Sequence, residues 1–358
     1  MPHSSEIVMI VPKLPPAIDG IGDYGFNLAK QLYQDFGWKT RFIVGTPESQ
    51  DEIEGDFFQT TIVQTRSQTA LLKLLPAPPA TVLLQYAGHG YAKRGCPVWL
   101  VNALEQWCHS GGTLVTMFHE LYATRPLLSS AILTQHLQRH LALQLMKFSD
   151  RILTNRSAYA EKICRFSKKQ SLSMPVFSNV GECLAPKPFK TRSRNLVIFG
   201  SSNARQQIYQ QSGFHLERIC RELQIETIID IGKELSIELN PLGMIPIQTF
   251  GVQCAEQISQ VLNDAIAGVV CYPANYLAKS GIFAAYCSHG VLPIVVSKRV
   301  QEQDGLRVNQ QYVLMQEALP NFPEAIATAA QTWYQSHSLR TQAHSFAQCL
   351  QALNLSLI

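Results

Sequence analysis

Short apolar runs alternate along this 358-residue chain with longer stretches in which apolar side chains recur every three or four positions. Runs that are apolar almost throughout predict strands buried on both faces, and the periodicity between them predicts helices. In the first half the predicted strands cover residues 6–12, 40–45, 80–86, 113–118 and 150–154. Strands and helices that alternate in this way predict a mostly parallel α/β sheet with helices on both faces.

The second half of the chain repeats this design. Its predicted strands cover residues 195–200, 226–232, 245–250, 266–272 and 292–296. Residues 185–195 (APKPFKTRSRN) precede them with two prolines and no apolar periodicity, which is typical of a linker. The chain is therefore expected to form two doubly wound domains, divided as 1–185, a linker at 186–194, 195–330 and a helical tail at 331–358.

Composition narrows the class of protein. Hydrophobic residues make up 46% of the chain, which is enough for a large core. The nine cysteines include no C-x-x-C pair, and their odd number disfavours a secreted disulfide framework. No apolar run approaches the ~20 residues that span a bilayer, and the first residues lack the pattern of a signal peptide. These features predict a cytoplasmic protein.

The net charge of +4 is distributed unevenly. From Lys147 to Arg194, eleven basic residues outnumber three acidic ones, so this segment carries +8 and the remainder −4. The excess of basic residues has two interpretations. It can belong to solvated helix faces and a basic linker, or it can form a surface that contacts an anionic membrane or substrate. No nucleic-acid partner is expected, because the sequence contains no recognition helix, zinc finger or aromatic RNA-binding platform.

Three turns at predicted helix starts have the composition of phosphate-binding loops. Glycine lets backbone N–H groups approach an anion, and serine hydroxyls or basic side chains add donors. The first turn follows the opening strand, and the other two follow strands of the second half: Gly20 to Asp23, Gly200 to Arg205, and Lys279 to Gly281. The last two turns together indicate a diphosphate site, although two unrelated turns would look the same.

His119 and Glu120 directly follow the predicted strand at 113–118. Ligands of open α/β sheets bind at this carboxyl edge, so the position favours a functional role. A lone histidine is also common as a hydrogen-bonded structural residue. Both interpretations remain open at this point.

Several motifs are absent. The sequence has no Asp-x-Asp pair, no G-x-S-x-G elbow, no Walker motif and no His-rich metal site, so neither a metal ion nor a cofactor is expected. Gly20 to Gly25 (GIGDYG) has the glycine spacing of the G-x-G-x-x-G fingerprint, but no acidic residue ends the next predicted strand at 40–45, as the dinucleotide-binding motif requires. This disfavours a nucleotide-dependent oxidoreductase built on two Rossmann-like halves.

Taken together, these motifs resemble GT-B-fold glycosyltransferases of the group 1, family-four type. Four segments in the family's order carry the resemblance: 16–24 (PAIDGIGDY), 118–122 (FHELY), 175–180 (PVFSNV) and 285–294 (AYCSHGVLPI). The resemblance implies two Rossmann-like domains facing a cleft, with C-terminal helices packing back across it. It also implies that the first domain binds the acceptor and the second binds a nucleotide-sugar donor.

The resemblance assigns roles to individual residues. His119 and Glu120 would act at the reacting sugar. The residues expected at the donor are Gly20, Ile21, Gly22, Asp23, Gly200, Ser201, Ser202, Arg205, Phe250, Gly251, Tyr272, Lys279, Ser280 and Gly281. The residues expected at the acceptor are Tyr86, Tyr91 and Arg125.

The sequence departs from the family at one place. Leu277 and Ala285 occupy the positions of two glutamates that contact the donor sugar and the ribose. The expected function is therefore a divergent glycosyltransferase that transfers a sugar from a nucleoside diphosphate with retention and without a metal. The alternative is a catalytically inactive GT-B protein that binds a nucleotide or glycan as a scaffold.

Overall fold

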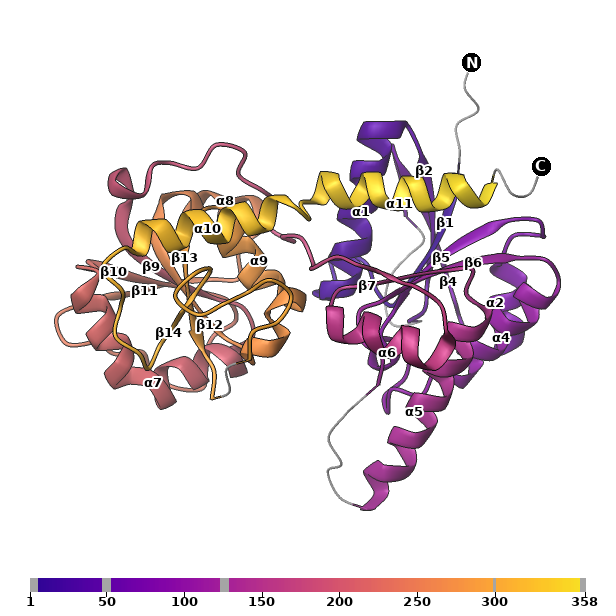
Figure 1. The fold of residues 1–358 in the computed structure, drawn as a ribbon, viewed down its shortest axis with the longest axis horizontal. Coiled ribbons are helices and arrows are strands. Elements are labelled where there is room, and N and C mark those ends of the chain that lie inside the picture. Colours follow the sequence, from indigo (N-terminus) through magenta and orange to yellow (C-terminus); the bar gives the residue numbers. More distant parts are fainter. Residues whose placement is uncertain (1–5, 47–52, 123–128, 299–300, 355–358) are drawn as a thin grey trace. The chain divides into compact units, whose positions relative to one another are not determined.

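The computed structural model describes residues 6–46, 53–122, 129–298 and 301–354. The chain divides into two compact units (Figure 1). The first unit contains Met1–Met174 and Leu339–Ile358, and the second contains Pro175–Ser338. Each has its own sheet and its own core.

The first unit is built on an eight-stranded sheet with the order β3-β4-β2-β1-β5-β6-β7-β8. Its strands are β1 (Glu6–Val11), β2 (Lys39–Val44), β3 (Glu54–Gly55), β4 (Phe58–Ile62), β5 (Thr81–Tyr86), β6 (Thr113–Phe118), β7 (Arg151–Thr154) and β8 (Leu172–Ser173). Every neighbouring pair is parallel except β3 and β4. The strand order changes direction between β1 and β5. In doubly wound sheets a crevice forms at such a point, outside the carboxyl ends of the strands.

The helices of the first unit are α1 (Gly20–Phe36), α2 (Gln68–Leu74), α3 (Gly88–Tyr91), α4 (Val98–His109), α5 (Ser129–Phe148), α6 (Ser157–Ser167) and α11 (Leu339–Asn354). Asp19 caps the start of α1, and Gly37 ends it in the left-handed conformation at φ 70°. The helix buries Leu28, Ala29 and Leu32. The C-terminal helix α11 packs against α1, as Figure 1 shows.

The second unit has a six-stranded parallel sheet with the order β11-β10-β9-β12-β13-β14. Its strands are β9 (Ser193–Phe199), β10 (Thr227–Ile231), β11 (Ile247–Gly251), β12 (Ala265–Cys271), β13 (Leu292–Val296) and β14 (Val313–Leu314). Its helices are η1 (Phe189–Thr191), α7 (Ser202–Glu222), α8 (Ala255–Asp264), η2 (Ala274–Lys279), α9 (Gly281–Ser288) and α10 (Pro323–Gln335). This order also changes direction, here between β9 and β12.

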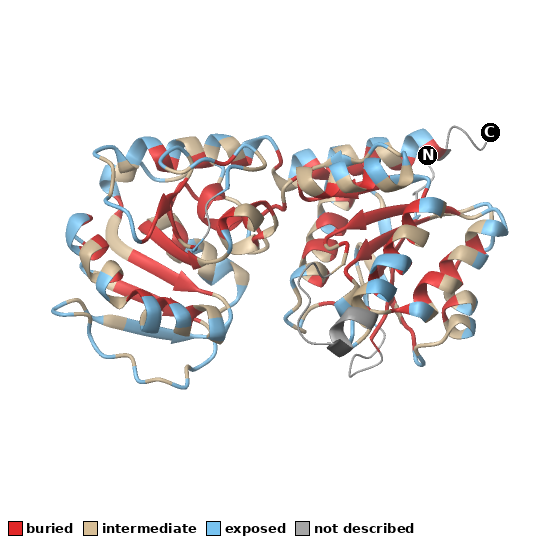
Figure 2. Ribbon diagram, turned by 60° about the horizontal axis from the view of Figure 1, so that its bottom comes forward, coloured by how far each residue is buried: buried red, intermediate tan, exposed pale blue. Residues whose placement is uncertain are grey.

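Burial follows the sheets (Figure 2). All six residues of β6 are buried, and six of the seven in β12 are, which accounts for their nearly continuous apolar sequences. β11 is an edge strand whose residues 248–251 are exposed. Among the described residues, no helix is both long and apolar enough to cross a membrane.

The two Rossmann-like domains predicted from the sequence are confirmed, but their boundaries differ. The predicted linker at 186–194 belongs to the second unit. Arg192 anchors it there, because the buried guanidinium donates to the carbonyls of Lys187, Ala265 and His289. The predicted tail at 331–358 is divided, with α10 in the second unit and α11 in the first.

A buried histidine near the end of α10 predicts a pH-dependent stability. His337 is 3% exposed and packs edge-on to Trp333 at 4.3 Å, and burial lowers its pKa to about 3. Below pH 6.5 the unfolded chain therefore binds a proton that the folded chain does not. Lowering the pH from 7.5 to 5 should cost about 2 kcal/mol of stability through this group.

Urea denaturation at both pH values checks this prediction. His337→Gln, which cannot titrate, should reduce the difference between the two pH values by about the same amount relative to the parent protein. Comparing the stability difference between the two pH values in the variant and in the parent removes the contributions of other groups. One of these is Asp23, whose raised pKa of about 6 makes the folded protein more stable as the pH falls. An unchanged difference in the variant would show that His337 titrates normally.

Candidate functional site

A cavity of about 450 Å³ lies in the second unit where β9 and β12 end. Its walls come from the end of β9, the first two turns of α7, the end of β12 and the start of α9. The residues that line it are Phe199, Ser201, Asn203, Ala204, Gln207, Ile208, Val269, Val270, Cys271, Tyr272, Lys279, Ser280, Gly281 and Ile282. The cavity therefore occupies the point where the strand order changes direction, the usual ligand position in such sheets.

Two helix N-termini meet this cavity. Ser201 caps α7 by accepting from the backbone N–H of Ala204, and Ser280 caps α9 by accepting from that of Phe283 at 3.2 Å. The N–H groups of a first helical turn carry partial positive charge. An anion in the cavity would therefore be favoured from two directions.

Lys279 adds a full positive charge to the lining. Its Nζ lies 5.9 Å from the centre of the Tyr276 ring. None of the residues lining the cavity is acidic. The electrostatics of the cavity thus suit a phosphate or diphosphate group.

The turn after β9 depends on glycine. Gly200 has φ 122°, and a side chain there would lie 2.5 Å from Cδ1 of Ile282. Glycine is favoured here chiefly because it adopts this positive φ without strain. The backbone of this turn is thereby held at the edge of the cavity.

Five of the residues expected at the donor are brought together by this fold: Ser201, Tyr272, Lys279, Ser280 and Gly281. Gly200 and Ser202 flank Ser201 in the same turn. Phe250 and Gly251 lie at the end of β11, two strands from β9, and do not line the cavity. Their assignment to the nucleobase stays a prediction.

Arg205 is buried and paired within the protein, which argues against its assignment to the diphosphate. Its side chain is 1% exposed and forms a salt bridge with Asp230. Its guanidinium also donates to the carbonyls of Gly200 and Lys233. Arg205 therefore fixes the turns after β9 and β10, and it is not among the residues that line the cavity.

The first turn of α1 is capped by a carboxylate of its own. The carboxylate of Asp19 accepts from the N–H groups of Ile21 and Gly22, at 3.1 and 2.8 Å. Burial and the nearby Asp19 raise the pKa of Asp23 to about 6. Because the turn supplies its own anion, a second one is less favourable there, and the assignment of Gly20, Ile21, Gly22 and Asp23 to the donor stays a prediction.

His119 lies at the carboxyl edge of β6, as predicted, but its ring is 5% exposed. Nε2 is 2.8 Å from the amide oxygen of Gln85, and the ring meets Tyr24 edge-on at 4.8 Å. The Tyr24 hydroxyl in turn donates to Gln342 of α11. This arrangement favours the structural interpretation of His119, and the catalytic roles of His119 and Glu120 stay predictions.

The tyrosines expected at the acceptor belong to the core of the first unit. Tyr86 and Tyr91 are both 0% exposed, and the Tyr91 hydroxyl donates to backbone carbonyls of Ile10 and Gln85. Neither can contact a ligand from these positions, so both assignments are wrong. Arg125, the third acceptor residue, lies outside the described residues.

The basic segment from Lys147 to Arg194 is divided between the units. Several of its charges have partners inside the protein, including Lys169 on two carbonyls and Lys187 on Asp264. Lys147, Arg151, Arg165 and Lys168 remain exposed. Contact with an anionic membrane stays a prediction.

Sequence inspection missed the wall contributed by α7. Asn203, Ala204, Gln207 and Ile208 line the cavity at the spacing of one helical face. The turn at Gly200 indicated that a helix begins there, and this periodicity could have identified the face. The position of β12 beside β9, which completes the wall, has no local signal.

Comparison with known proteins identifies the fold of this chain. Neither a family model nor a curated protein matches the sequence. Three solved structures that are similar to this chain are a putative UDP-N-acetylglucosamine 2-epimerase from Listeria monocytogenes, a glycosyltransferase from Rickettsia africae, and an alpha-glucosyltransferase in complex with UDP and a 13-mer DNA.

The three comparisons cover nearly the whole of both chains. The epimerase has a TM-score of 0.58 and 10% identity and covers 98% of this chain and 97% of its own. For the Rickettsia protein these values are 0.57, 11%, 98% and 98%, and for the alpha-glucosyltransferase 0.55, 10%, 97% and 99%. This chain has the GT-B fold.

The GT-B fold agrees with the architecture of the two units, but it does not determine the reaction. One of the similar structures is an epimerase and two are transferases. Because one is in complex with DNA, the expectation that this GT-B protein binds no nucleic acid stays a prediction. Function has to be argued from the site.

Proposed function

We propose that this GT-B protein transfers a sugar from a nucleoside-diphosphate sugar to an acceptor, with retention of configuration and without a metal ion. The observation that carries the proposal is the cavity at the end of β9 and β12, lined by two helix N-termini and Lys279. Its volume of about 450 Å³ suits a diphosphate with part of a nucleoside. UDP is the proposed nucleotide, because similar structures were solved with UDP.

The physical basis of the proposal is charge stabilisation. Departure of the sugar leaves additional negative charge on the diphosphate. Helix N-termini and a lysine fixed in position stabilise that charge without reorganising during the reaction. In this role Lys279 and the N–H group of Gly281, at the start of α9, replace a divalent ion. The roles of His119 and Glu120 at the reacting sugar belong to the proposal as well.

A second candidate function is a GT-B protein that binds a nucleotide without turning it over. Leu277 and Ala285, at the positions of the family's glutamates, are 1% and 0% exposed. Both belong to the core, and no acidic side chain lines the cavity. The carboxylates that would accept hydrogen bonds from the sugar and ribose hydroxyls are thus missing from the lining of the cavity.

Binding of UDP with and without EDTA tests the proposal. We expect UDP to bind in isothermal titration calorimetry with a dissociation constant that EDTA changes less than about twofold, because the positive groups belong to the protein. Failure to bind UDP, GDP and ADP would contradict both candidates. A strong loss of affinity in EDTA would contradict metal independence.

Turnover separates the two candidates. Release of UDP from UDP-glucose, alone or with added acceptors, would support the transferase, and tight UDP binding without release would support the binding protein.

Membrane contact and a cytoplasmic location belong to the proposal as well. Flotation with vesicles of anionic or neutral lipid tests the first of these.

A further inference from the structure

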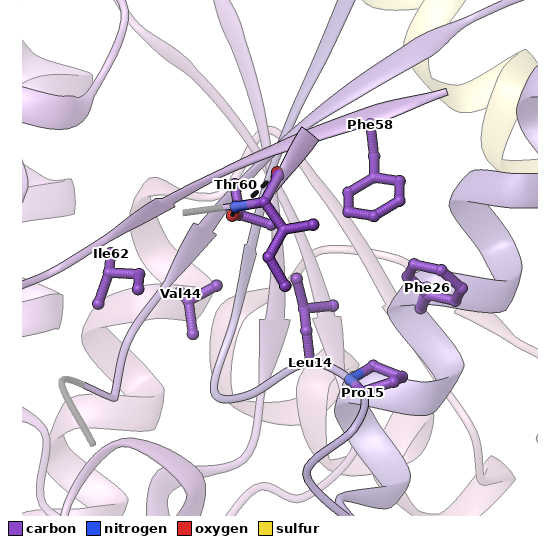
Figure 3. Close-up of a pocket in the computed structure, with 8 residues that line it drawn as sticks. Leu14, Pro15, Phe26, Val44, Phe58, Thr60 and Ile62 are labelled. Atoms are coloured by element: carbon purple, nitrogen blue, oxygen red, sulfur yellow. Dashed lines mark hydrogen bonds between the residues drawn. The ribbon is translucent and has the colours of Figure 1, made fainter. Parts of the chain in front are cut away.

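The first unit contains a second pocket, which none of the predicted site residues lines. It has a volume of about 90 Å³. Figure 3 shows the side chains that surround it: Leu14, Pro15, Phe26, Val44, Ile53, Phe58, Thr60 and Ile62. Seven of the eight are hydrophobic, which distinguishes this pocket from the polar cavity of the second unit.

The only polar side chain of the pocket is already hydrogen-bonded. The Thr60 hydroxyl accepts from the N–H of Ile53 at 2.6 Å and donates to the Ile53 carbonyl at 3.1 Å (Figure 3). Water needs two to four polar partners to be held in a cavity. This pocket therefore favours an apolar group over water.

The walls of the pocket are well supported. Thr60 and Ile62 are buried on β4, and Val44, at the end of β2, is 2% exposed. Phe26 of α1 meets Phe58 edge-on at 5.2 Å. Such packing preserves the pocket's shape when nothing is bound. By contrast, Ile53 is 43% exposed, which places part of the lining at the surface.

The position of the pocket connects it to the acidic turn of α1. Phe26 follows Asp23 by three residues, so their side chains lie on the same side of the helix. The carboxylates of Asp19 and Asp23 would repel a diphosphate but can accept a hydrogen bond from a hydroxyl. An apolar pocket one helical turn from such carboxylates suits a molecule with an apolar end and a hydroxyl.

We propose that this pocket binds the apolar end of the sugar acceptor, a branched aliphatic group or one of similar size. A cavity of ~150 Å³ holds benzene, so about 90 Å³ has room for roughly four carbon atoms. The assignment to the acceptor rests on the proposed function. The existence of an apolar binding site does not.

Xenon tests the site directly. In full-length protein with ¹³C-labelled methyl groups, xenon should shift the methyl signals of Leu14, Val44 and Ile62. The methyl signals of Leu196 and Ile198, in the core of the second unit, should stay in place. No shift at the three pocket residues would overturn the site.

Two variants locate the effect. Val44→Phe fills the pocket and should abolish the xenon shifts at Leu14 and Ile62. Val98→Phe makes the same change at a 40% exposed position on α4 and should preserve them. If Val44→Phe does not fold, Leu14→Ala serves instead, because the enlarged pocket should bind benzene, which the parent should exclude. Absence of benzene binding in this variant would overturn the site.

The acceptor assignment needs an alcohol that carries the apolar group. With UDP-glucose as donor, 3-methylbutan-1-ol should have a KM at least about tenfold below that of glycerol, and Val44→Phe should remove this advantage. Equal KM values would overturn the assignment. Absence of both UDP binding and transfer would instead refute the proposed function, and the xenon shifts would still decide whether the site exists.

Discussion

Gly281→Asp should weaken UDP binding at least about 100-fold and leave the protein folded. Gly281 is the first residue of α9, and its N–H lies at the edge of the cavity. A carboxylate there would occupy the anion position and repel a diphosphate by several kcal/mol at ~4 Å. The same carboxylate should stabilise the helix by ~0.3–1 kcal/mol, because it lies at a helix N-terminus.

Space at this position makes the substitution informative. A Cβ at Gly281 would have Nδ2 of Asn179 as its nearest neighbour, at 3.8 Å, which is an ordinary contact. Gly281→Asn has nearly the same size without the charge and should lose less than about tenfold in affinity. Ala255→Asp adds the charge at the first residue of α8, outside the cavity, and should bind UDP normally.

Calorimetric titration with UDP, together with urea denaturation, distinguishes these effects. Normal UDP binding by Gly281→Asp would show that the nucleotide binds elsewhere. Equal losses in the Asp and Asn variants would indicate a steric effect rather than an electrostatic one. Only a loss that follows the charge supports a diphosphate at the start of α9.

Arg205→Met should destabilise the second unit by about 3–5 kcal/mol, the cost of removing one partner from a buried ion pair. The substitution leaves the Asp230 carboxylate 3% exposed, with the Tyr209 hydroxyl at 2.9 Å as its remaining side-chain partner. Burial already raises the pKa of Asp230, and Arg205 counteracts that rise. Without the guanidinium the carboxyl group must become protonated or remain charged at a high cost.

Urea denaturation measures this loss, and two further variants control it. Arg221→Met removes a surface pair with Glu217 on the same helix and should cost less than about 1 kcal/mol. Combined with Asp230→Asn, Arg205→Met should cost less than the sum of the single changes, because both act on one ion pair. A stable Arg205→Met protein that had lost only its UDP affinity would restore the ligand role assigned from the sequence.

The strands show what can be predicted locally. All ten strands predicted from apolar runs exist, with ends that differ by two residues at most. Burial on both faces of a parallel sheet requires such runs, so the signal is strong. β4 was missed because only Phe58 and Ile62 are apolar in FQTTI, and its pairing with β2 compensates for this weak pattern. The predicted boundary lies later in the chain than the observed one at Pro175, because prolines and basic residues resemble a linker even where Arg192 anchors them.

The candidate site shows where local prediction ends. The sequence by itself determined two doubly wound domains and the turns at Ser201 and Ser280, since apolar runs, glycines and helix caps act over a few residues. Only the tertiary structure decided which polar groups line the cavity. Arg205 forms a buried ion pair with Asp230, twenty-five residues later, whereas Lys279 lines the cavity. Which charged side chain lines a cavity depends on packing partners that are distant in the sequence.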